Sequence, residues 1–415
     1  MIPPRPWVTF SKAGGQTLES LLRDVKVPCS ARDWADAASS GRRGADVPDG
    51  GTGFVRTLRG NVSHAAGGSG MEPPAPPRRV TIVDVARHAQ VSTTAVSKVL
   101  RNAYGASPEM RARVRRAIDE LGYRPYAAAR GLRGQTYTIG VMLPDIRNPF
   151  FPEILDGITS RLQGTDYQVF LGPGCNGEKE EARVTEAMID RGMDGIVLVA
   201  PVSSPTRLEH VASVVPTVVI GRHGCSPVYD TVTDDDVAGA ALIVSHLAGL
   251  GHRRIAHIEH HETDPTRIAE MPNAQRADGY RRAMRSLGLA DEIDVVSTSY
   301  TQQGGYRGAK ELLGRPHRPT AVFAGADIVA MGVLEAVAEA GLSVPGEISV
   351  AGYDNTTFAA FGPISLTSVD QAGHEIGANA ARLLLERIAD RHKPSVQVRL
   401  SPTLVPRRTT SAAPE

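Results

Sequence analysis

One short stretch of the chain combines hydroxyl, amide and cationic side chains at helical spacing, which is the chemistry needed to contact DNA. Hydroxyl groups can reach base edges or phosphates, and Lys or Arg can pair with guanine or with phosphate. Arginines before and after this stretch add the positive charge that sequence-independent affinity requires. The side chains that we expect to contact DNA in this stretch are Thr81, Ser92, Thr93, Thr94, Ser97, Lys98, Arg101 and Asn102.

Three helices are predicted to position these side chains. Thr81 followed by Asp84 fits a capping box, Ser92 can cap a second helix, and Ser107 followed by Pro108 is a third helix start. Two short helices joined by a tight turn, with a third to close a small core, form a helix-turn-helix unit whose second helix enters the major groove. The side chains expected on the outside of that second helix are Thr93, Thr94, Ser97 and Lys98.

The order of these residues resembles a known family. The runs DVARHAQVSTTAVSKVL, SPEMRARVRRAIDELGYRP and AARGLR are similar to the headpiece and hinge of the LacI/GalR family of bacterial transcriptional regulators. The resemblance implies that Leu132, with Ala129 one turn before it, enters the minor groove at the operator centre, where apolar wedging bends DNA. The family usually has Asn where Tyr126 stands.

From Tyr137 onward, β-branched apolar runs alternate with helical patterns in two series that meet near Asp235. Such alternation predicts parallel sheets with helices on both faces, and hence two Rossmann-like lobes separated by a cleft. Ligands of open parallel sheets bind outside the carboxyl ends of the strands. The runs DIRNPFF, DDDVAGA, QRADGY, AVFAGADIVAMG and VAGYDN also follow the family's order. The resemblance implies a periplasmic-binding-protein-like architecture, with the chain crossing between lobes near Asp235, Leu366 and His392.

Five residues are candidates for contact with an effector in the cleft. Phe150, Phe151 and Tyr300 follow predicted strands, and their aromatic faces could enclose a sugar ring or a base. Arg276 and Asp327 match family positions that hydrogen-bond the effector, and a donor fork with an acceptor pair suits a polyhydroxylated ligand. Structural roles are open for three of them, because Phe151 could be core, Arg276 a surface charge and Asp327 a helix cap.

Two departures from the family's pattern leave the ligand's identity open. Ala326 stands where the family commonly has Asn, and Gly221-Arg222 stands where it commonly has an Asp-Arg pair. A sugar is the first expectation because the resemblance is to a family dominated by sugar sensors. A purine or nucleoside is the alternative.

Other patterns could indicate different chemistry. The segment from Gly172 to Gly177 fits GxGxxG, but it follows the second strand of the series and carries Pro in the phosphate turn, so an NAD-dependent oxidoreductase is disfavoured. GxSxG is absent, and no Cys lies in a recognised nucleophile motif, so hydrolase chemistry has no support. The acidic and imidazole side chains that could suggest a metal are His257, Glu259, His260, His261 and Glu262, but they alternate along a strand and into a loop and need not face one point. We therefore expect no enzyme activity, cofactor or metal.

Composition sets broad limits. The formal net charge of +1 is near neutral, so the positive charge is local rather than global. Three dispersed cysteines give no disulfide framework, and neither a membrane-length apolar run nor a secretory signal is found, which predicts a cytoplasmic protein. A transport-linked sugar-binding protein, the rival with the same two lobes, would need such a signal and no headpiece.

The predicted organisation follows. Residues 1–77 form a disordered or untranslated extension in which Leu18 to Val27 could make one short helix, and Met71 is the hypothetical initiator. Residues 78–125 form the headpiece, 126–136 the hinge, 137–409 the effector-binding and dimerisation domain, and 410–415 a tail. Lobe 1 comprises residues 137–234 and 367–391, and lobe 2 comprises residues 235–366 and 392–409. The predicted function is an effector-controlled repressor that binds double-stranded operator DNA as a homodimer.

Overall fold

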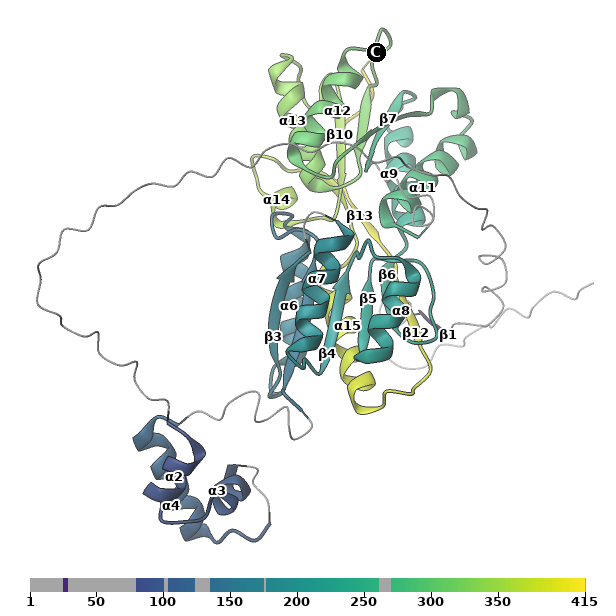
Figure 1. Cartoon of the computed structure of the whole chain (residues 1–415). Coiled ribbons are helices and arrows are strands. Elements are labelled where there is room, and N and C mark those ends of the chain that lie inside the picture. The colour runs from purple at the N-terminus through teal and green to yellow at the C-terminus, as the bar shows by residue number, and fades with distance from the viewer. Residues whose placement is uncertain are drawn as a thin grey trace, which may run out of the picture. The chain divides into compact units, whose positions relative to one another are not determined.

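The computed structural model describes residues 25–28, 80–100, 104–123, 135–174, 177–260 and 270–414, with backbone only for 25–28. The chain divides into two compact units, which are described separately. One is Ser30–Gln135, and the other joins Met1–Cys29 to Thr136–Glu415 (Figure 1). No helix in the described ranges is both long and apolar enough to cross a membrane.

The smaller unit contains the three helices that the sequence predicts: α2 (Ile82–His88), α3 (Thr93–Leu100) and α4 (Pro108–Leu121). Each begins at the expected cap. Thr81 and Asp84 form a reciprocal capping box, the Ser92 hydroxyl accepts from the amide of Ala95 at 3.1 Å, and Ser107 caps α4. The helices enclose a small core of Val85, Ala86, Ala89, Val96, Val99, Val114 and Ala117.

Lobe 1 of the larger unit is a seven-stranded sheet in the order β1-β12-β6-β5-β4-β2-β3. Its strands are β1 (Val25–Pro28), β2 (Thr138–Leu143), β3 (Gln168–Pro173), β4 (Gly195–Val199), β5 (Thr217–Ile220), β6 (Asp230–Asp234) and β12 (Val396–Leu400). All pairs are parallel except that of β1 with β12.

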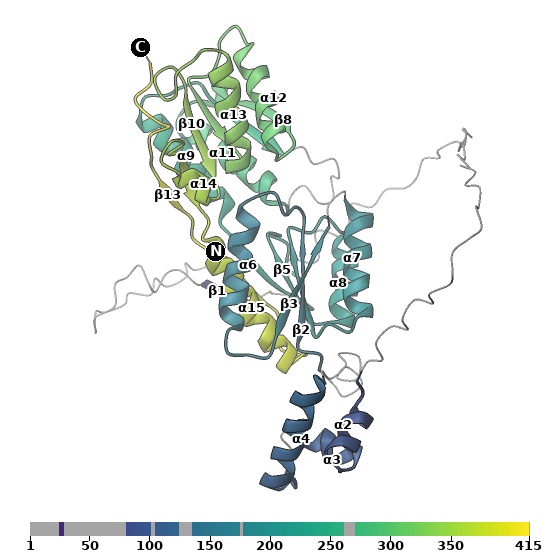
Figure 2. The ribbon, with the colours of Figure 1, turned by 90° about the vertical axis from the view of Figure 1, so that its left-hand side faces the viewer.

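Two helices cover each face of that sheet. Helices α6 (Phe150–Leu162) and α15 (Gly373–Ala389) pack on one face, and α7 (Glu178–Asp190) and α8 (Pro205–Val214) on the other (Figure 2). Consecutive strand residues serve opposite cores, as Val141 packs with the first pair of helices and Met142 with the second. Burial on both faces explains why these strands read as continuous apolar runs.

Lobe 2 is a six-stranded sheet in the order β13-β11-β10-β9-β7-β8. Its strands are β7 (Ile255–His260), β8 (Asp294–Thr298), β9 (Ala321–Ala324), β10 (Ser349–Tyr353), β11 (Thr367–Asp370) and β13 (Thr403–Val405). Helices α9 (Asp236–Gly249) and α11 (Pro272–Ser286) cover one face, and α12 (Gln302–Leu313) and α13 (Asp327–Glu339) cover the other. Two short helices, η2 (Ala290–Glu292) and α14 (Thr357–Ala360), complete the lobe. The predicted doubly wound architecture is confirmed.

The chain passes between the lobes three times, and two crossings lie later than predicted. The first, from β6 to α9, is at Asp235. The second crossing was predicted near Leu366 but comes after β11, so residues 367–370 belong to lobe 2. The chain turns there at Ala372, whose φ is +58°. The third follows β12 rather than His392, so residues 396–400 belong to lobe 1. A β-branched strand suits either sheet, and only its pairing partner decides which it joins.

Within the N-terminal extension, the structure contains strand β1, where the sequence suggested a helix from Leu18 to Val27. Residues 25–28 pair antiparallel with β12, so the helix prediction is wrong for Val25, Lys26 and Val27. The β-branched valines on either side of Lys26 fit an edge strand. The rest of the extension, including Met71, and most of the hinge lie outside the described residues.

Candidate functional site

The outer surface of α3 carries three of the predicted DNA contacts. Thr93, Thr94 and Lys98 are exposed there, and the capping residues Thr81 and Ser92 are exposed beside it. Ser97 is only 8% exposed, so the prediction that it faces outward is wrong. Helix α3 packs against both α2 and α4, so its buried arc is wider than the stripe marked by Val96 and Val99. Arg101, Asn102, Ala129 and Leu132 lie outside the described residues.

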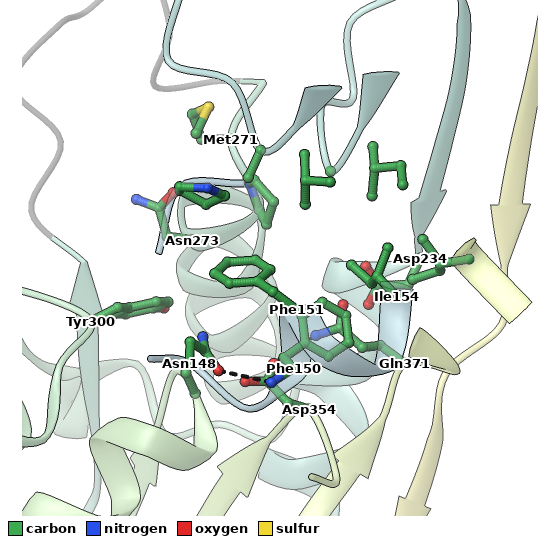
Figure 3. A pocket seen from close by; sticks show the side chains of 18 of the residues that line it. Asn148, Phe150, Phe151, Ile154, Asp234, Met271, Asn273, Tyr300, Asp354 and Gln371 are labelled. Carbon is green, nitrogen blue, oxygen red and sulfur yellow. Dashed lines mark hydrogen bonds between the residues drawn. The ribbon is translucent and has the colours of Figure 1, made fainter. Parts of the chain in front are cut away.

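The larger unit contains a cavity of about 250 Å³ between its two lobes (Figure 3). It lies beyond the carboxyl ends of β4, β5 and β6 of lobe 1 and of β7 and β10 of lobe 2, which is where open parallel sheets bind ligands. Lobe 1 contributes most of the apolar wall, chiefly Phe150, Phe151, Ile154, Val199 and Ile220. The lining from lobe 2 is mainly polar, chiefly His260, Asn273, Arg276, Tyr300 and Asp354, and lobe 1 adds the polar residues Asp145, Asn148, Thr233 and Asp234.

Among the described residues that line this cavity, Arg276 is the only Lys or Arg, and other groups hold its side chain in place. Its Nε donates to Asp236 Oδ1 at 2.6 Å, and its Nη1 donates to the carbonyl of Gly325 at 2.8 Å and lies 3.8 Å from Asp354 Oδ1. Its guanidinium carbon stacks 3.9 Å from the centre of the Tyr353 ring. A donor fork held this firmly is oriented before any ligand arrives.

Three buried side-chain atoms of lining residues have no hydrogen-bond partner among the residues that the structure describes. They are Asp354 Oδ2, the Tyr300 hydroxyl and the Thr233 hydroxyl. The other oxygen of Asp354 accepts from Gln371 Nε2 at 2.6 Å, so its carboxylate is half satisfied. Because buried polar groups without a partner are costly, these atoms indicate a polar occupant that supplies both donors and acceptors.

Burial shifts two acids of the cavity, Asp234 and Asp354, toward their neutral forms. Desolvation raises the pKa of Asp354 well above its usual value, and Arg276 only partly opposes this. Desolvation and the nearby Asp236 carboxylate raise the pKa of Asp234 to about 7, although the Tyr353 hydroxyl donates to Asp234 Oδ2 at 2.7 Å. The charge of an anionic ligand would disfavour the ionised forms of these two acids still further, so the site favours an uncharged ligand over an anion.

Four of the five predicted effector residues line the cavity, namely Phe150, Phe151, Arg276 and Tyr300. Asp327 is outside the lining, in contrast to the prediction. One of its oxygens accepts from the amide and hydroxyl of Thr356 at 2.7 and 3.0 Å, and the other from the Ser368 hydroxyl at 2.6 Å. Asp327 therefore secures the loop after β10 rather than meeting the cavity.

The sequence prediction missed several polar residues of the lining. Asp354 is the clearest, because it directly follows β10 and belongs to the run VAGYDN, whose position at a strand end was a usable signal. Asp234 ends β6 in the same way. Asn273 and Gln371 had no local signal, because they enter the cavity from the first turn of α11 and from a crossing segment.

The glycine-rich run of lobe 1 has a packing role. A methyl group at Gly172 would lie 2.3 Å from Val184 Cγ1, and one at Gly174 would lie 2.7 Å from the Met142 sulfur. Gly172 therefore lets α7 approach the sheet, and Gly174 leaves room for the Met142 side chain. Across the described part of the chain, no three His, Cys, Asp or Glu side chains gather as metal ligands, and His261 and Glu262 fall outside it.

Known proteins match this chain over both units. The family model "Bacterial regulatory proteins, lacI family" matches residues 81–126, and "Periplasmic binding protein-like domain" matches residues 244–410. The HTH-type transcriptional repressor PurR of Erwinia tasmaniensis is 33% identical over 339 residues, covering 80% of this chain and 98% of that protein. The ribose operon repressor of Escherichia coli is 35% identical over 335 residues, covering 79% and 98%.

A solved structure extends this likeness to the effector domain. The LacI family transcriptional regulator from Enterococcus faecium with bound ribose has a TM-score of 0.59 and 30% identity. It covers 66% of this chain and 99% of its own.

Proposed function

This chain belongs to the lacI family of bacterial regulatory proteins, and on that premise we propose that it is a transcriptional repressor whose operator affinity is controlled by a sugar. Proteins of this family regulate transcription and are not enzymes. The headpiece binds operator DNA in the cytoplasm, and the effector enters the cavity between the lobes. Effector binding changes the relative stability of DNA-competent and DNA-incompetent arrangements.

The headpiece supports the DNA-binding part of the proposal. Thr93, Thr94 and Lys98 are presented on the exposed side of α3, whose opposite side is held by the three-helix core. Arg113, Arg115 and Arg116 are exposed along α4 and supply positive charge. Lys98 is proposed to pair with a base or phosphate in the major groove, and the arginines to add affinity that depends on salt.

Exposed apolar side chains in both lobes support a homodimer. Phe170 and Leu171 on the edge strand β3 are 49% and 52% exposed, and Phe358 and Phe361 in and after α14 are 50% and 59% exposed. A sheet edge and large exposed apolar groups are surfaces that a second copy can cover. A two-fold dimer would read a near-palindromic operator.

The three unpartnered polar atoms of the cavity carry the proposal of a sugar. A sugar hydroxyl both donates and accepts, so it can donate to Asp354 Oδ2 and bond the hydroxyls of Tyr300 and Thr233. The apolar face of the ring would lie against Phe151. A cavity of about 250 Å³ is below the size usual for drug-like ligands, which favours a monosaccharide. The ribose operon repressor and the ribose-bound relative agree with this class.

A purine base is the second candidate. Phe151 and Tyr300 both line the cavity from different lobes, and flat rings could enclose a base. The likeness to a PurR repressor favours the same alternative. The unpartnered hydroxyls favour the sugar, because a base has fewer groups that both donate and accept.

The test is thermal unfolding of the full chain with a panel of neutral monosaccharides, beginning with D-ribose, and with hypoxanthine, guanine and sugar phosphates. A ligand at 100-fold its Kd should raise Tm by about 5 °C. We expect the shift with a neutral sugar and none with its phosphate. A shift with purine bases alone would replace the sugar proposal by its alternative.

A further inference from the structure

A short loop after β5 of lobe 1 places two basic side chains against lobe 2. The loop is residues 221–224, and its Arg222 is 1% exposed. Arg222 Nη1 donates to the carbonyl of Ser203 at 2.7 Å and to that of Pro201 at 3.4 Å, both in lobe 1. Because these two carbonyls hold Nη1, the orientation of the planar guanidinium is fixed, and Nη2 points in one direction.

The partner of that guanidinium comes from lobe 2. Arg222 Nη2 forms an ion pair with the carboxylate of Glu270, which precedes α11. The backbone amide of His223 also donates to the carbonyl of Glu270 at 2.9 Å. Gly224 makes this approach possible, because a methyl group there would lie 2.6 Å from the carboxyl carbon of Glu270. One residue of lobe 2 is thus held twice by one loop of lobe 1.

The same loop connects to the wall of the cavity. His223 Nε2 lies 2.7 Å from Asp236 Oδ2, and the other oxygen of Asp236 accepts from Arg276 Nε at 2.6 Å. Arg276 lines the cavity. A continuous series of polar contacts therefore runs from the loop to the effector site, and both share the lobe interface.

We propose that Arg222, His223 and Glu270 form an interlobe latch that stabilises the arrangement of the lobes seen here. If the lobes separate, Arg222 keeps its two carbonyl partners but loses Glu270, its only carboxylate partner among the described residues. Separation would break this partly exposed ion pair and the hydrogen bond from His223 to Glu270, so both contacts oppose it. The latch therefore sets how often the lobes adopt this arrangement in the absence of ligand. If the effector binds this arrangement, that fraction scales its apparent affinity.

The latch is tested on the full chain without ligand or DNA, so its outcome is independent of the proposed function. Glu270→Gln keeps the shape of the side chain and removes its charge. Hydrogen exchange should become about two- to fivefold faster in peptides covering residues 221–224 and 270–273, as expected for loss of a partly exposed ion pair. The matched control is Glu186→Gln, which breaks the Arg207–Glu186 pair within lobe 1 and should leave those peptides unchanged.

A second variant opens the latch sterically and leaves every charge in place. Gly224→Ala suits the backbone, because Gly224 is not among the residues with positive φ, but its methyl group displaces the Glu270 carboxylate. We expect the same local increase in exchange as for Glu270→Gln. Exchange as slow as in the unmodified chain in both variants, or an equal rise over all of both lobes, would overturn the latch.

Discussion

The two lobes bring opposite chemistry to one cavity. Lobe 1 presents mainly rings and branched aliphatic groups, such as Phe151 and Val199, whereas lobe 2 presents Arg276, Tyr300 and Asp354. An apolar wall makes the binding free energy more favourable for any ligand that covers it, roughly in proportion to the apolar area buried. A buried polar wall makes binding less favourable for a ligand that leaves its donors and acceptors unpaired. We therefore expect lobe 1 to set how tightly ligands bind in general, and lobe 2 to determine which ligand binds.

The local structure explains this division. The chain leaves β2 of lobe 1 and starts α6 with two phenylalanines, so the helix turns apolar groups toward the cleft. In lobe 2, by contrast, Asp354 and Tyr300 stand just beyond strand ends, and α11 contributes Asn273 and Arg276 from its first turns. The exceptions are four polar residues of lobe 1, namely Thr233 and Asp234 at the end of β6 and Asp145 and Asn148 between β2 and α6.

The largest effect is expected for the carboxylate of lobe 2. Asp354→Asn replaces one carboxyl oxygen beside Arg276 by an amide nitrogen, which cannot accept a hydrogen bond. It should weaken binding of the sugar found by thermal unfolding by about 10- to 100-fold. Isothermal titration measures this, with the exposed Asp291→Asn of the same lobe as control. An affinity within twofold of the unmodified chain would break the assignment of specificity to lobe 2.

A smaller and less selective effect is expected for the ring of lobe 1. Phe151→Ala removes aromatic contact area and should weaken every ligand that binds by about tenfold, whatever its hydroxyl pattern. Titration with the effector and with a weaker sugar epimer gives the comparison. A loss confined to one of the two sugars would show that lobe 1 also selects, contrary to the division proposed.

The Tyr300 hydroxyl should affect only the discrimination between ligands that have the partner hydroxyl and ligands that lack it. Tyr300→Phe keeps the ring and its T-shaped contact with His260, whose centre is 5.2 Å away, and removes only the unpartnered oxygen. We expect a loss of about three- to tenfold for the effector. The deoxy analogue that lacks the partner hydroxyl should bind both proteins alike, and an equal loss for that analogue would count against the contact.

The smallest expected effect is a pH dependence of stability that comes from Asp234, at the end of β6 in lobe 1. Burial raises the pKa of Asp234 from 3.8 to about 7, with Asp236, Arg276, Tyr353 and His223 around it. The folded chain then binds a proton more tightly than the unfolded chain, so this stabilisation is present at low pH and is lost as pH rises toward 7.

Asp234→Asn carries no charge at any pH and should escape this loss. Its Tm relative to the unmodified chain should therefore rise between about pH 5 and about pH 8. Burial lowers the pKa of His257 to about 3, so the contribution of His257 to stability increases with pH. This contribution is the same in both proteins and does not change the difference between their Tm values. A Tm difference that stays constant with pH would contradict the assignment to Asp234.

The headpiece could be predicted almost completely, because its signals are local. Caps at Thr81, Ser92 and Ser107 each lie within three residues of the amide that they bind, and Gly122 ends α4 in the left-handed conformation. The exception is Ser97, whose burial depends on how two other helices pack around α3.

The cavity could be predicted only in part, because distant segments build it. Asp327 and Asp354 both stand just beyond the ends of adjacent strands, β9 and β10, and the pattern alone did not show which one reaches the cavity. The hydrogen bonds from Thr356 and Ser368 decide this, since they turn Asp327 into a structural acceptor. The positions of the crossings after β11 and β12 could not be predicted for the same reason, because they are set by strand pairing between distant segments.

The central claim, that this chain reads DNA under the control of a ligand in the cleft, is tested most directly by selection from a random DNA library. The full chain would be used with and without the sugar that raises its Tm, and with Lys98→Ala as control. We predict enrichment of one near-palindromic sequence, a change in its recovery with the sugar, and loss of enrichment in Lys98→Ala. No enriched sequence from a folded dimer under either condition would contradict the account.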